Sequence, residues 1–312
     1  MKMAQSASPA QVFLCLSMLC LSLGCLGSGR TALAQTIDEP ALVHSEKSLY
    51  RQVFVYEDKG QRCLCFTHQC SIGRQSCIDL LRPQQLVFEY TQMMLAALFL
   101  NPQPKHILVI GLGGGTLPMT LQKLLPDAQI DAVEVDPAVV RVAQRFFGFH
   151  EGERLHVAEQ DGRAYIRQAV RSGRHFDLVM LDAYDNQYIP EHMLTREFLE
   201  EVRSTLEPGG IVAANTFSMS RLYSNESVTY QDVFGNFYNL KRSNRIILAT
   251  NGPLPPLDVV RRNGARYAEA LDRMGSSSQT LLDSFTTVPD WDSKARVLTD
   301  QYSPANLLNV LP

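Results

Sequence analysis

The stretch HILVIGLGGGTLPMTLQKLLPDAQIDAVEVD, residues 106–136, decides the fold of this chain. An apolar run ahead of the glycines predicts a buried parallel strand, and Thr116 is expected to cap an amphipathic helix. A second apolar strand ends on Glu134 and Asp136, which completes a β-α-β unit. Glycines let the backbone pass close under a ligand, and the helix N-terminus presents free N–H groups to it. The stretch therefore predicts a nucleotide-type turn followed by an acid that can accept both hydroxyls of a ribose.

Acids also follow the strands that come after this unit. Apolar runs predict strands at residues 155–158, 176–181 and 211–215, with helices between them and Thr195 as the cap of the last helix. Because ligands bind at the carboxyl ends of strands in an open parallel sheet, we expect the residues at those ends to share one site. Each acid has a structural alternative, since it could instead cap the next helix or hold a turn. The strand ends that together favour a ligand site carry the glycine turn, Glu134, Asp161, Asp182 and Asp185.

The composition disfavours a nucleic-acid partner. The 312 residues include 29 Lys and Arg against 32 Asp and Glu, for a net charge of −3, and the chain has no basic run. Proteins that bind nucleic acid normally show a basic patch or stripe. The length suits one large α/β domain with a small appendage.

The N-terminus has the pattern of a leader for export. Lys2 supplies a short positive region, residues 12–26 are nearly all apolar, and Ala32-Leu33-Ala34 matches a cleavage site before Gln35. The apolar run is too short for a comfortable membrane span, which needs about 20 residues. The pattern predicts a periplasmic or secreted protein with no stable membrane span after the leader is removed. A lipoprotein anchored at Cys25 fits less well, because the branched apolar residue expected ahead of the cysteine is missing.

Four cysteines outside the leader lie within fifteen positions of one another. An even count confined to a small β-rich segment favours two disulfides, for which three pairings are open. Zinc is the alternative, but the spacing C-x-C-x4-C-x6-C lacks the usual C-x2-C knuckle, so we expect no metal. The disulfide candidates are Cys63, Cys65, Cys70 and Cys77.

An ordered set of motifs over residues 48–215 resembles the spermidine synthases (polyamine aminopropyltransferases) and their relatives on the AdoMet-methyltransferase fold. A weaker likeness continues at residues 298–304. The motifs are Phe88-Glu89-Tyr90, the glycine turn with its flanks at residues 109–117, Val133-Glu134-Val135-Asp136, Asp161-Gly162-Arg163-Ala164-Tyr165, and Leu181-Asp182-Ala183-Tyr184-Asp185 followed by Leu194-Thr195-Arg196-Glu197-Phe198.

The resemblance implies a role for each matching position. Asp182 would be the catalytic acid/base, Asp185 and Tyr90 would line the amine site, and Gln52 would contact the nucleoside. The residues implied to hold the sulfonium nucleoside are Gly111, Gly113, Gly114 and Gly115 beneath it, Glu134 at the ribose, and Asp161 with Gly162 at the adenine amine.

The implied activity is transfer of an aminopropyl group from decarboxylated S-adenosylmethionine to a polyamine such as putrescine, with no metal. The family often forms homodimers. It usually carries an Asp inside the glycine loop, which is missing here, and its Tyr- and Pro-containing segment after the fifth strand has no clear match. Two alternatives therefore stay open: a methyltransferase that uses intact S-adenosylmethionine, and a non-catalytic exported protein that binds a nucleoside or polyamine.

The fold class that follows is α/β, with a Rossmann-like, AdoMet-methyltransferase-type, mostly parallel sheet and helices on both faces. A small N-terminal β-hairpin domain precedes it. The predicted parts are a signal peptide over residues 1–34, the β-hairpin domain over 35–82, the Rossmann-like catalytic domain over 83–274 and a C-terminal tail packed on that domain over 275–312. The pattern also predicts a helix over 84–100, an edge strand over 245–250 and a final long helix over 257–274.

Overall fold

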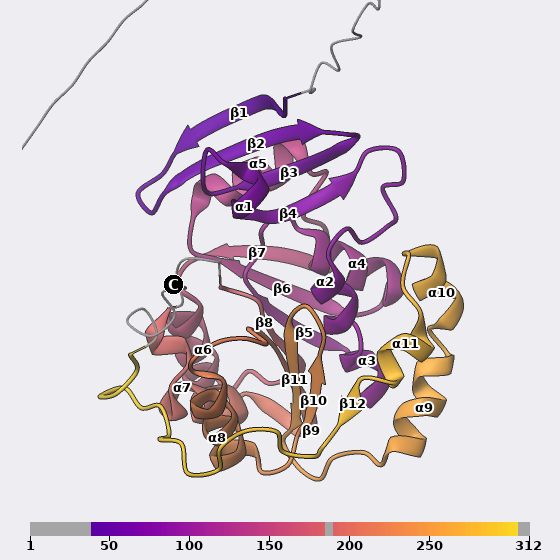
Figure 1. Ribbon diagram of the computed structural model, residues 1–312. Coiled ribbons are helices and arrows are strands. Elements are labelled where there is room, and N and C mark those ends of the chain that lie inside the picture. The colour runs from indigo at the N-terminus through magenta and orange to yellow at the C-terminus, as the bar shows by residue number, and fades with distance from the viewer. Residues whose placement is uncertain (1–38, 185–189, 305–312) are drawn as a thin grey trace, which may run out of the picture. The chain divides into compact units, whose positions relative to one another are not determined.

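A small antiparallel sheet precedes the α/β part of the chain in the computed structural model, which describes residues 39–184 and 190–304 (Figure 1). Its strands pair in the order β1-β2-β3-β4. The turn between β2 and β3 has two central residues with positive φ, Lys59 at 49° and Gly60 at 78°, as a tight hairpin requires. The bounds are β1 Ala41–Lys47, β2 Gln52–Asp58, β3 Gln61–Cys65 and β4 Arg74–Asp79, with the short helix α1 Cys70–Gly73 ahead of β4.

Two disulfides close this sheet. Cys63 and Cys77 face each other across β3 and β4 and are bonded, and Cys65 is bonded to Cys70 at the start of α1. All four sulfur-bearing side chains are buried beside Phe54. The structure thus contains one of the three pairings that the sequence left open.

The second sheet has eight strands in the order β12-β10-β11-β9-β8-β5-β6-β7. The strands from β9 to β7 are parallel, whereas β11, β10 and β12 are added antiparallel at the other end. The bounds are β5 His106–Ile110, β6 Gln129–Glu134, β7 Leu155–Glu159, β8 Phe176–Leu181, β9 Leu206–Thr216, β10 Tyr238–Lys241, β11 Arg245–Thr250 and β12 Phe285–Thr286.

Helices cover both faces of this sheet (Figure 1). One face packs against α3, α4, α9, α10 and α11, and the other against α6, α7 and α8. The bounds are α2 Glu89–Met94, α3 Ala97–Leu100, α4 Thr116–Leu124, α5 Pro137–Phe146, α6 Gly162–Ser172, η1 Glu191–Met193, α7 Arg196–Ser204, α8 Tyr223–Phe234, α9 Leu257–Ala265, α10 Ala268–Arg273 and α11 Ser278–Leu282. No helix in the described ranges is both long and apolar enough to cross a bilayer.

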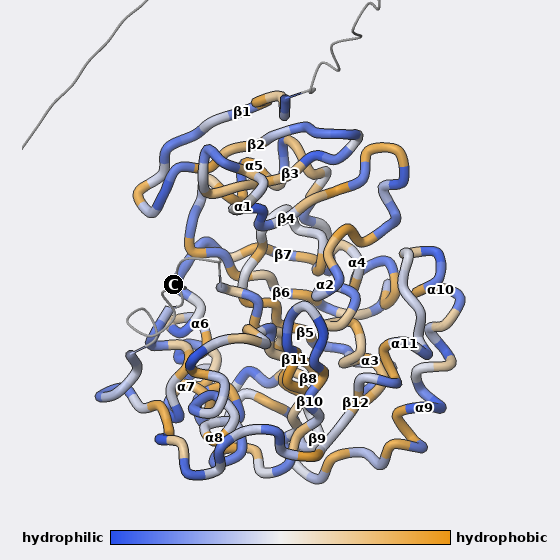
Figure 2. Tube along the Cα trace, viewed as in Figure 1, coloured by the Kyte–Doolittle hydropathy of each residue, from blue (hydrophilic) through white to orange (hydrophobic). Residues whose placement is uncertain are grey.

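Alternate residues of each central strand supply the two cores. In β5, Val109 belongs to the core under α4, whereas Leu108 and Ile110 belong to the core under α6 and α7. A strand buried on both faces is apolar throughout, which is why the central strands are coloured hydrophobic in Figure 2. Helix α5 joins the two sheets, because its Val139 and Val142 pack against the valines of β2.

The strand order reverses next to β5. The chain runs outward from β5 to β6 and β7, then returns to β8 on the other side of β5. Ligands of open α/β sheets bind at such a reversal, outside the carboxyl ends of the strands.

Four local predictions were wrong in detail. Gly115, with φ of 76°, occupies the N-cap of α4, and Thr116 is the first helical residue. The helix predicted over 84–100 is two short helices, since the amides of Ala96, Leu98 and Phe99 bond three residues back rather than four. All side chains from Met93 to Leu100 are buried, so this segment is a piece of the core.

The strand predicted at an edge, β11, lies inside the sheet between β9 and β10. The final helix is interrupted between α9 and α10, where the amides of Arg266 and Tyr267 also bond three residues back. At this break Gly264 faces the ring of Phe99, and a Cβ there would lie 3.1 Å from a ring carbon. Close packing on α3 therefore accounts for both the glycine and the bend.

Candidate active site

A cavity of about 510 Å³ lies at the carboxyl ends of the central strands. It is bounded by the glycine turn after β5, by the ends of β6, β8 and β9, and by η1. Residues of the small N-terminal sheet, among them Arg51, Phe66 and Ser76, form a further wall. The predicted strand ends thus surround one space, as expected at the reversal of strand order.

The glycines of the turn divide into two kinds. Gly111 has φ of 101°, and a Cβ there would overlap the backbone carbonyl oxygen of Asp182, so only glycine allows the ends of β5 and β8 to meet. Gly111 and Gly113 line the cavity. Gly114 and Gly115 face the rings of Phe147 and Phe149 instead, where a Cβ would lie 2.8 Å and 2.6 Å from ring carbons. Packing accounts for these last two glycines.

Glu134 is held in place by backbone amides. One carboxylate oxygen accepts from the amide of Leu112 at 3.1 Å, and the other accepts from the amide of Asp136 at 3.0 Å. Burial raises the pKa of Glu134 above its ordinary value, while these two amides oppose the shift. The neighbouring acid has the capping role, because Asp136 accepts from the amide of Ala138 at 2.9 Å and from the hydroxyl of Ser48 at 2.6 Å. Glu134 is therefore fixed with its side chain in the cavity wall.

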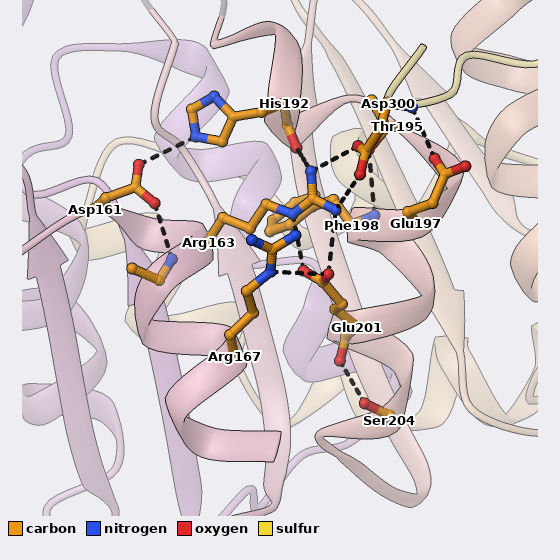
Figure 3. Close-up of polar contacts among 11 residues, drawn as sticks. Asp161, Arg163, Arg167, His192, Thr195, Glu197, Phe198, Glu201, Ser204 and Asp300 are labelled. Atoms are coloured by element: carbon orange, nitrogen blue, oxygen red, sulfur yellow. Dashed lines mark hydrogen bonds and ion pairs between the residues drawn. The ribbon is translucent and has the colours of Figure 1, made fainter. Parts of the chain in front are cut away.

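Asp161 both caps a helix and faces the cavity. Its Oδ1 accepts from the amide of Ala164 at 2.8 Å, which caps α6. Its Oδ2 lies 3.1 Å from Nε2 of His192, which comes from η1 (Figure 3). The hydrogen bond from His192 is the largest cause that lowers the pKa of Asp161. Gly162 follows directly and also lines the cavity.

Asp182 is surrounded by uncharged polar groups. Its Oδ1 accepts from the amide of Asn215 at 2.9 Å, and the Asn215 carbonyl in turn accepts from Asn244 at 2.9 Å. The hydroxyl of Tyr90 also interacts with the carboxyl. Burial raises the pKa of Asp182 to about 7, even though the hydrogen bonds from Asn215 and Tyr90 lower it. The site thus contains a carboxyl group poised to exchange a proton near neutral pH.

Of the two remaining predicted residues, Asp185 lies outside the described residues. Gln52 does not line the cavity, because it points from β2 toward β1, where its amide donates to Ser45 at 2.7 Å. The neighbouring Arg51 lines the cavity in its place.

Several residues that line the cavity were not predicted to have a role there. Asn215 was predicted only as the end of the fifth strand, although a polar residue at that position could have been included with the acids at the other strand ends. His192 has no recognisable signal, since it lies in a short 3-10 helix after a segment without periodicity. Tyr184 was predicted only as part of a motif, and its buried hydroxyl has no hydrogen-bond partner among the described residues.

An open α/β sheet with a glycine turn, a backbone-held acid and a buried carboxyl at the strand reversal defines a protein of the AdoMet-methyltransferase fold with a nucleoside-type cavity. The family model described as the spermine/spermidine synthase domain matches residues 87–241. The polyamine aminopropyltransferase of Vibrio vulnificus is 42% identical over 279 residues, which cover 88% of this chain and 93% of that protein. The chain therefore belongs to the spermine/spermidine synthase family, whose members are transferases.

Two solved structures have the same fold. A probable spermidine synthase from Corynebacterium glutamicum aligns with a TM-score of 0.61 at 17% identity, covering 81% of this chain and 98% of that one. Human methyltransferase-like protein 13 in complex with SAH aligns with a TM-score of 0.52 at 25% identity, covering 66% of this chain and 96% of that one. The first supports the fold alone, and the second shows that methyltransferases share it.

The comparisons correct the prediction of export. The relatives are polyamine aminopropyltransferases, which are normally cytoplasmic enzymes. The leader-like pattern covers residues 1–34, which lie outside the described ranges. A periplasmic or secreted protein is therefore no longer the expectation.

Proposed function

We propose that this chain transfers the aminopropyl group of decarboxylated S-adenosylmethionine to a polyamine such as putrescine. The observation that carries the proposal is Asp182, a buried carboxyl with a pKa of about 7 beside the glycine turn. Its hydrogen-bond partners Asn215 and Tyr90 are uncharged, so the cavity keeps a negative charge available for a cationic acceptor.

The role of Asp182 follows from the chemistry of amines. A polyamine nitrogen is mostly protonated at neutral pH and has no lone pair to attack with. A carboxylate in hydrogen-bond reach binds the ammonium, accepts its proton and directs the freed lone pair. The nitrogen then forms a C–N bond to the methylene carbon next to the sulfonium. The C–S bond breaks, and its electron pair stays on sulfur, which leaves as neutral methylthioadenosine while the proton passes from Asp182 to solvent.

The other residues of the cavity would hold the nucleoside. Glu134 is oriented by two backbone amides, so it can accept from both ribose hydroxyls without rearranging. Gly113 leaves room for the sulfonium end, and Asp161 would accept from the adenine amine. Tyr90 would line the amine site with Asp182, and Asp185 is proposed there from the family motif alone.

A methyltransferase using intact S-adenosylmethionine is the second candidate. Two observations favour it: Arg51 and Arg74 line the cavity, and the glycine turn has no acid. A guanidinium there could pair with the methionine carboxylate, which the decarboxylated donor lacks.

Donor preference separates these functions. The full chain is incubated with putrescine and either decarboxylated or intact S-adenosylmethionine, and products are identified by mass spectrometry. We expect methylthioadenosine and spermidine in equal amounts from the decarboxylated donor. S-Adenosylhomocysteine formed from the intact donor would instead support the methyltransferase. Tight binding of methylthioadenosine with no product from either donor would indicate a binding protein without turnover.

A further inference from the structure

The backbone at His192 is held by hydrogen bonds from two other segments of the chain. Its imidazole is about half exposed and faces Asp161 across the cavity wall (Figure 3). Its backbone carbonyl accepts from Nη1 of Arg163 at 2.9 Å. The preceding carbonyl, that of Glu191, accepts from the hydroxyl of Ser303 at 2.9 Å. Two separate segments of the chain therefore hold η1 in place.

Arg163 is the centre of the hydrogen-bond network that holds η1. It is buried, and its guanidinium donates to both oxygens of Glu201, at 2.8 and 3.1 Å, and to both oxygens of Asp300, at 2.7 and 2.9 Å. With the bond to His192, each N–H of the guanidinium has an acceptor. Thr195 adds a bond to Asp300 at 2.7 Å. A fully bonded buried guanidinium is costly to disturb, so the position of η1 is fixed relative to α6.

Asp161 is the N-cap residue of the same helix, α6. Oδ1 of Asp161 is committed to the amide of Ala164, which leaves Oδ2 as the oxygen that faces the cavity. A carboxylate oxygen has room for two hydrogen bonds, and the imidazole of His192 uses one of them. Asp161 also lines the cavity and its side chain is 42% exposed, so a donor inside the cavity can reach the carboxylate.

Resting on the proposed function, we propose that His192 determines the base specificity of the nucleoside site. It holds Oδ2 of Asp161 toward the base, so the pair accepts a purine with an exocyclic 6-amino group and rejects one with a 6-oxo group. Arg163 is a positioning residue that acts through the backbone of His192. A surface ion pair alone would be worth little, but this one lines the cavity and is supported by the network around Arg163.

The discrimination has a simple physical origin. A 6-amino group donates to the free position on Asp161, whereas a 6-oxo group would place a second acceptor against a carboxylate. Sites that hydrogen-bond a polar substituent discriminate strongly against an analogue that leaves them unpaired. If the imidazole is removed, Asp161 loses its bond to Nε2 and its side chain can turn, so the preference weakens.

Calorimetry on the full chain tests this directly. Methylthioadenosine and its 6-oxo analogue methylthioinosine are titrated into the wild type, His192→Ala, His192→Gln and the control His175→Ala, an exposed histidine outside the cavity. We expect His192→Ala to weaken the binding of methylthioadenosine about tenfold and the binding of methylthioinosine less than about twofold. His192→Gln should recover part of the difference, because its amide can donate to Asp161. The control should match the wild type.

The role of Arg163 is tested by a cycle. Arg163→Lys keeps the charge but cannot make all five bonds. As a single substitution it should lower the preference for methylthioadenosine over methylthioinosine. Added to His192→Ala it should cause no further loss of that preference. Arg167→Ala, which removes a partner of Glu201 at 3.0 Å without touching His192, should leave the preference unchanged. If His192→Ala weakened the binding of both nucleosides equally, or of neither, this inference would be overturned while the proposed function would stand. Failure of the wild type to bind methylthioadenosine would overturn the proposed function with it.

Discussion

Replacing Asp182 by Asn should abolish transfer and at the same time stabilise the protein at neutral and alkaline pH. Asparagine has the size of aspartate, and its carbonyl can still accept from Asn215, while its amide can donate to the hydroxyl of Tyr90. The geometry of the cavity should therefore survive. The change removes only the negative charge and the ability to take a proton.

The stability effect follows from the raised pKa. An aspartate ordinarily titrates near 3.8, and burial raises the pKa of Asp182 to about 7 in the folded protein. Between these values the folded state holds a proton that the unfolded state has released, so stability falls as pH rises through this window. A shift of about 3 pH units corresponds to about 4 kcal/mol, since each unit is worth about 1.4 kcal/mol. Above pH 7 the wild type bears the full free-energy cost of the buried charge, whereas Asp182→Asn carries no charge and does not bear it.

The activity effect follows from the same proton. A positioned general base contributes a factor of about 10² to 10⁴, so kcat/KM should fall by that much in Asp182→Asn. In the wild type, kcat/KM should rise with pH through about 7 as the free enzyme's carboxyl ionises, and the variant should lose this rise. Binding of methylthioadenosine should change little.

Both effects can be measured on one preparation of each protein. Urea unfolding at pH 5 and pH 8 gives the free energy of unfolding, and the difference between variant and wild type should grow by about 3 kcal/mol toward pH 8. The exposed Asp283→Asn is the control and should show no such growth. A variant whose advantage is the same at both pH values, or whose turnover equals that of the wild type, would refute the assignment of the proton to Asp182.

Two further predictions concern the frame of the site. Gly111→Ala should cost more than about 2 kcal/mol of stability in urea unfolding, because its Cβ would overlap the carbonyl of Asp182. The control Gly148→Ala, at φ of 71° with no atom within 4 Å of its Cβ, should cost about 1 kcal/mol. Similar losses in the two variants would contradict the packing argument. Arg245→Met should cost about 3–5 kcal/mol because it leaves the buried Glu226, 4.0 Å away, without its cation. The double variant with Glu226→Leu should recover part of that loss, and strictly additive losses would show that the pair does not interact.

The strands and the strand ends could be predicted because they follow from local rules. Buried parallel strands must be apolar throughout, and polar residues where they end must lie at one edge of the sheet. Glu134, Asp161 and Asp182 were placed together for this reason, and the structure brings all three to one cavity. The glycine turn was also predictable, but the separate reasons for Gly111 and Gly115 depend on which side chains face them across the fold.

Long-range contacts account for what the sequence could not reveal. His192 acquires its place through Arg163 and Asp300, a residue 108 positions further along the chain. Gln52 was assigned to the cavity from a family position, but its side chain lies on the face of the small sheet where it donates to Ser45 of β1. The interior place of β11 depends on the four-residue β10, which is too short to show a period.

The small N-terminal sheet bears on which kind of acceptor the cavity can take. Its Ser76 lies against the glycine turn, with its hydroxyl 3.3 Å from that of Thr116, and Ser48 donates to Asp136 beyond Glu134. Arg62 donates to the carbonyl of Phe146 at 2.7 Å, so the sheet is also fixed to the end of α5. The sheet is therefore held against both the glycine turn and α5, and it contributes part of the cavity wall. A cavity of about 510 Å³ has the size of a small-molecule site, which suits a small amine as the acceptor.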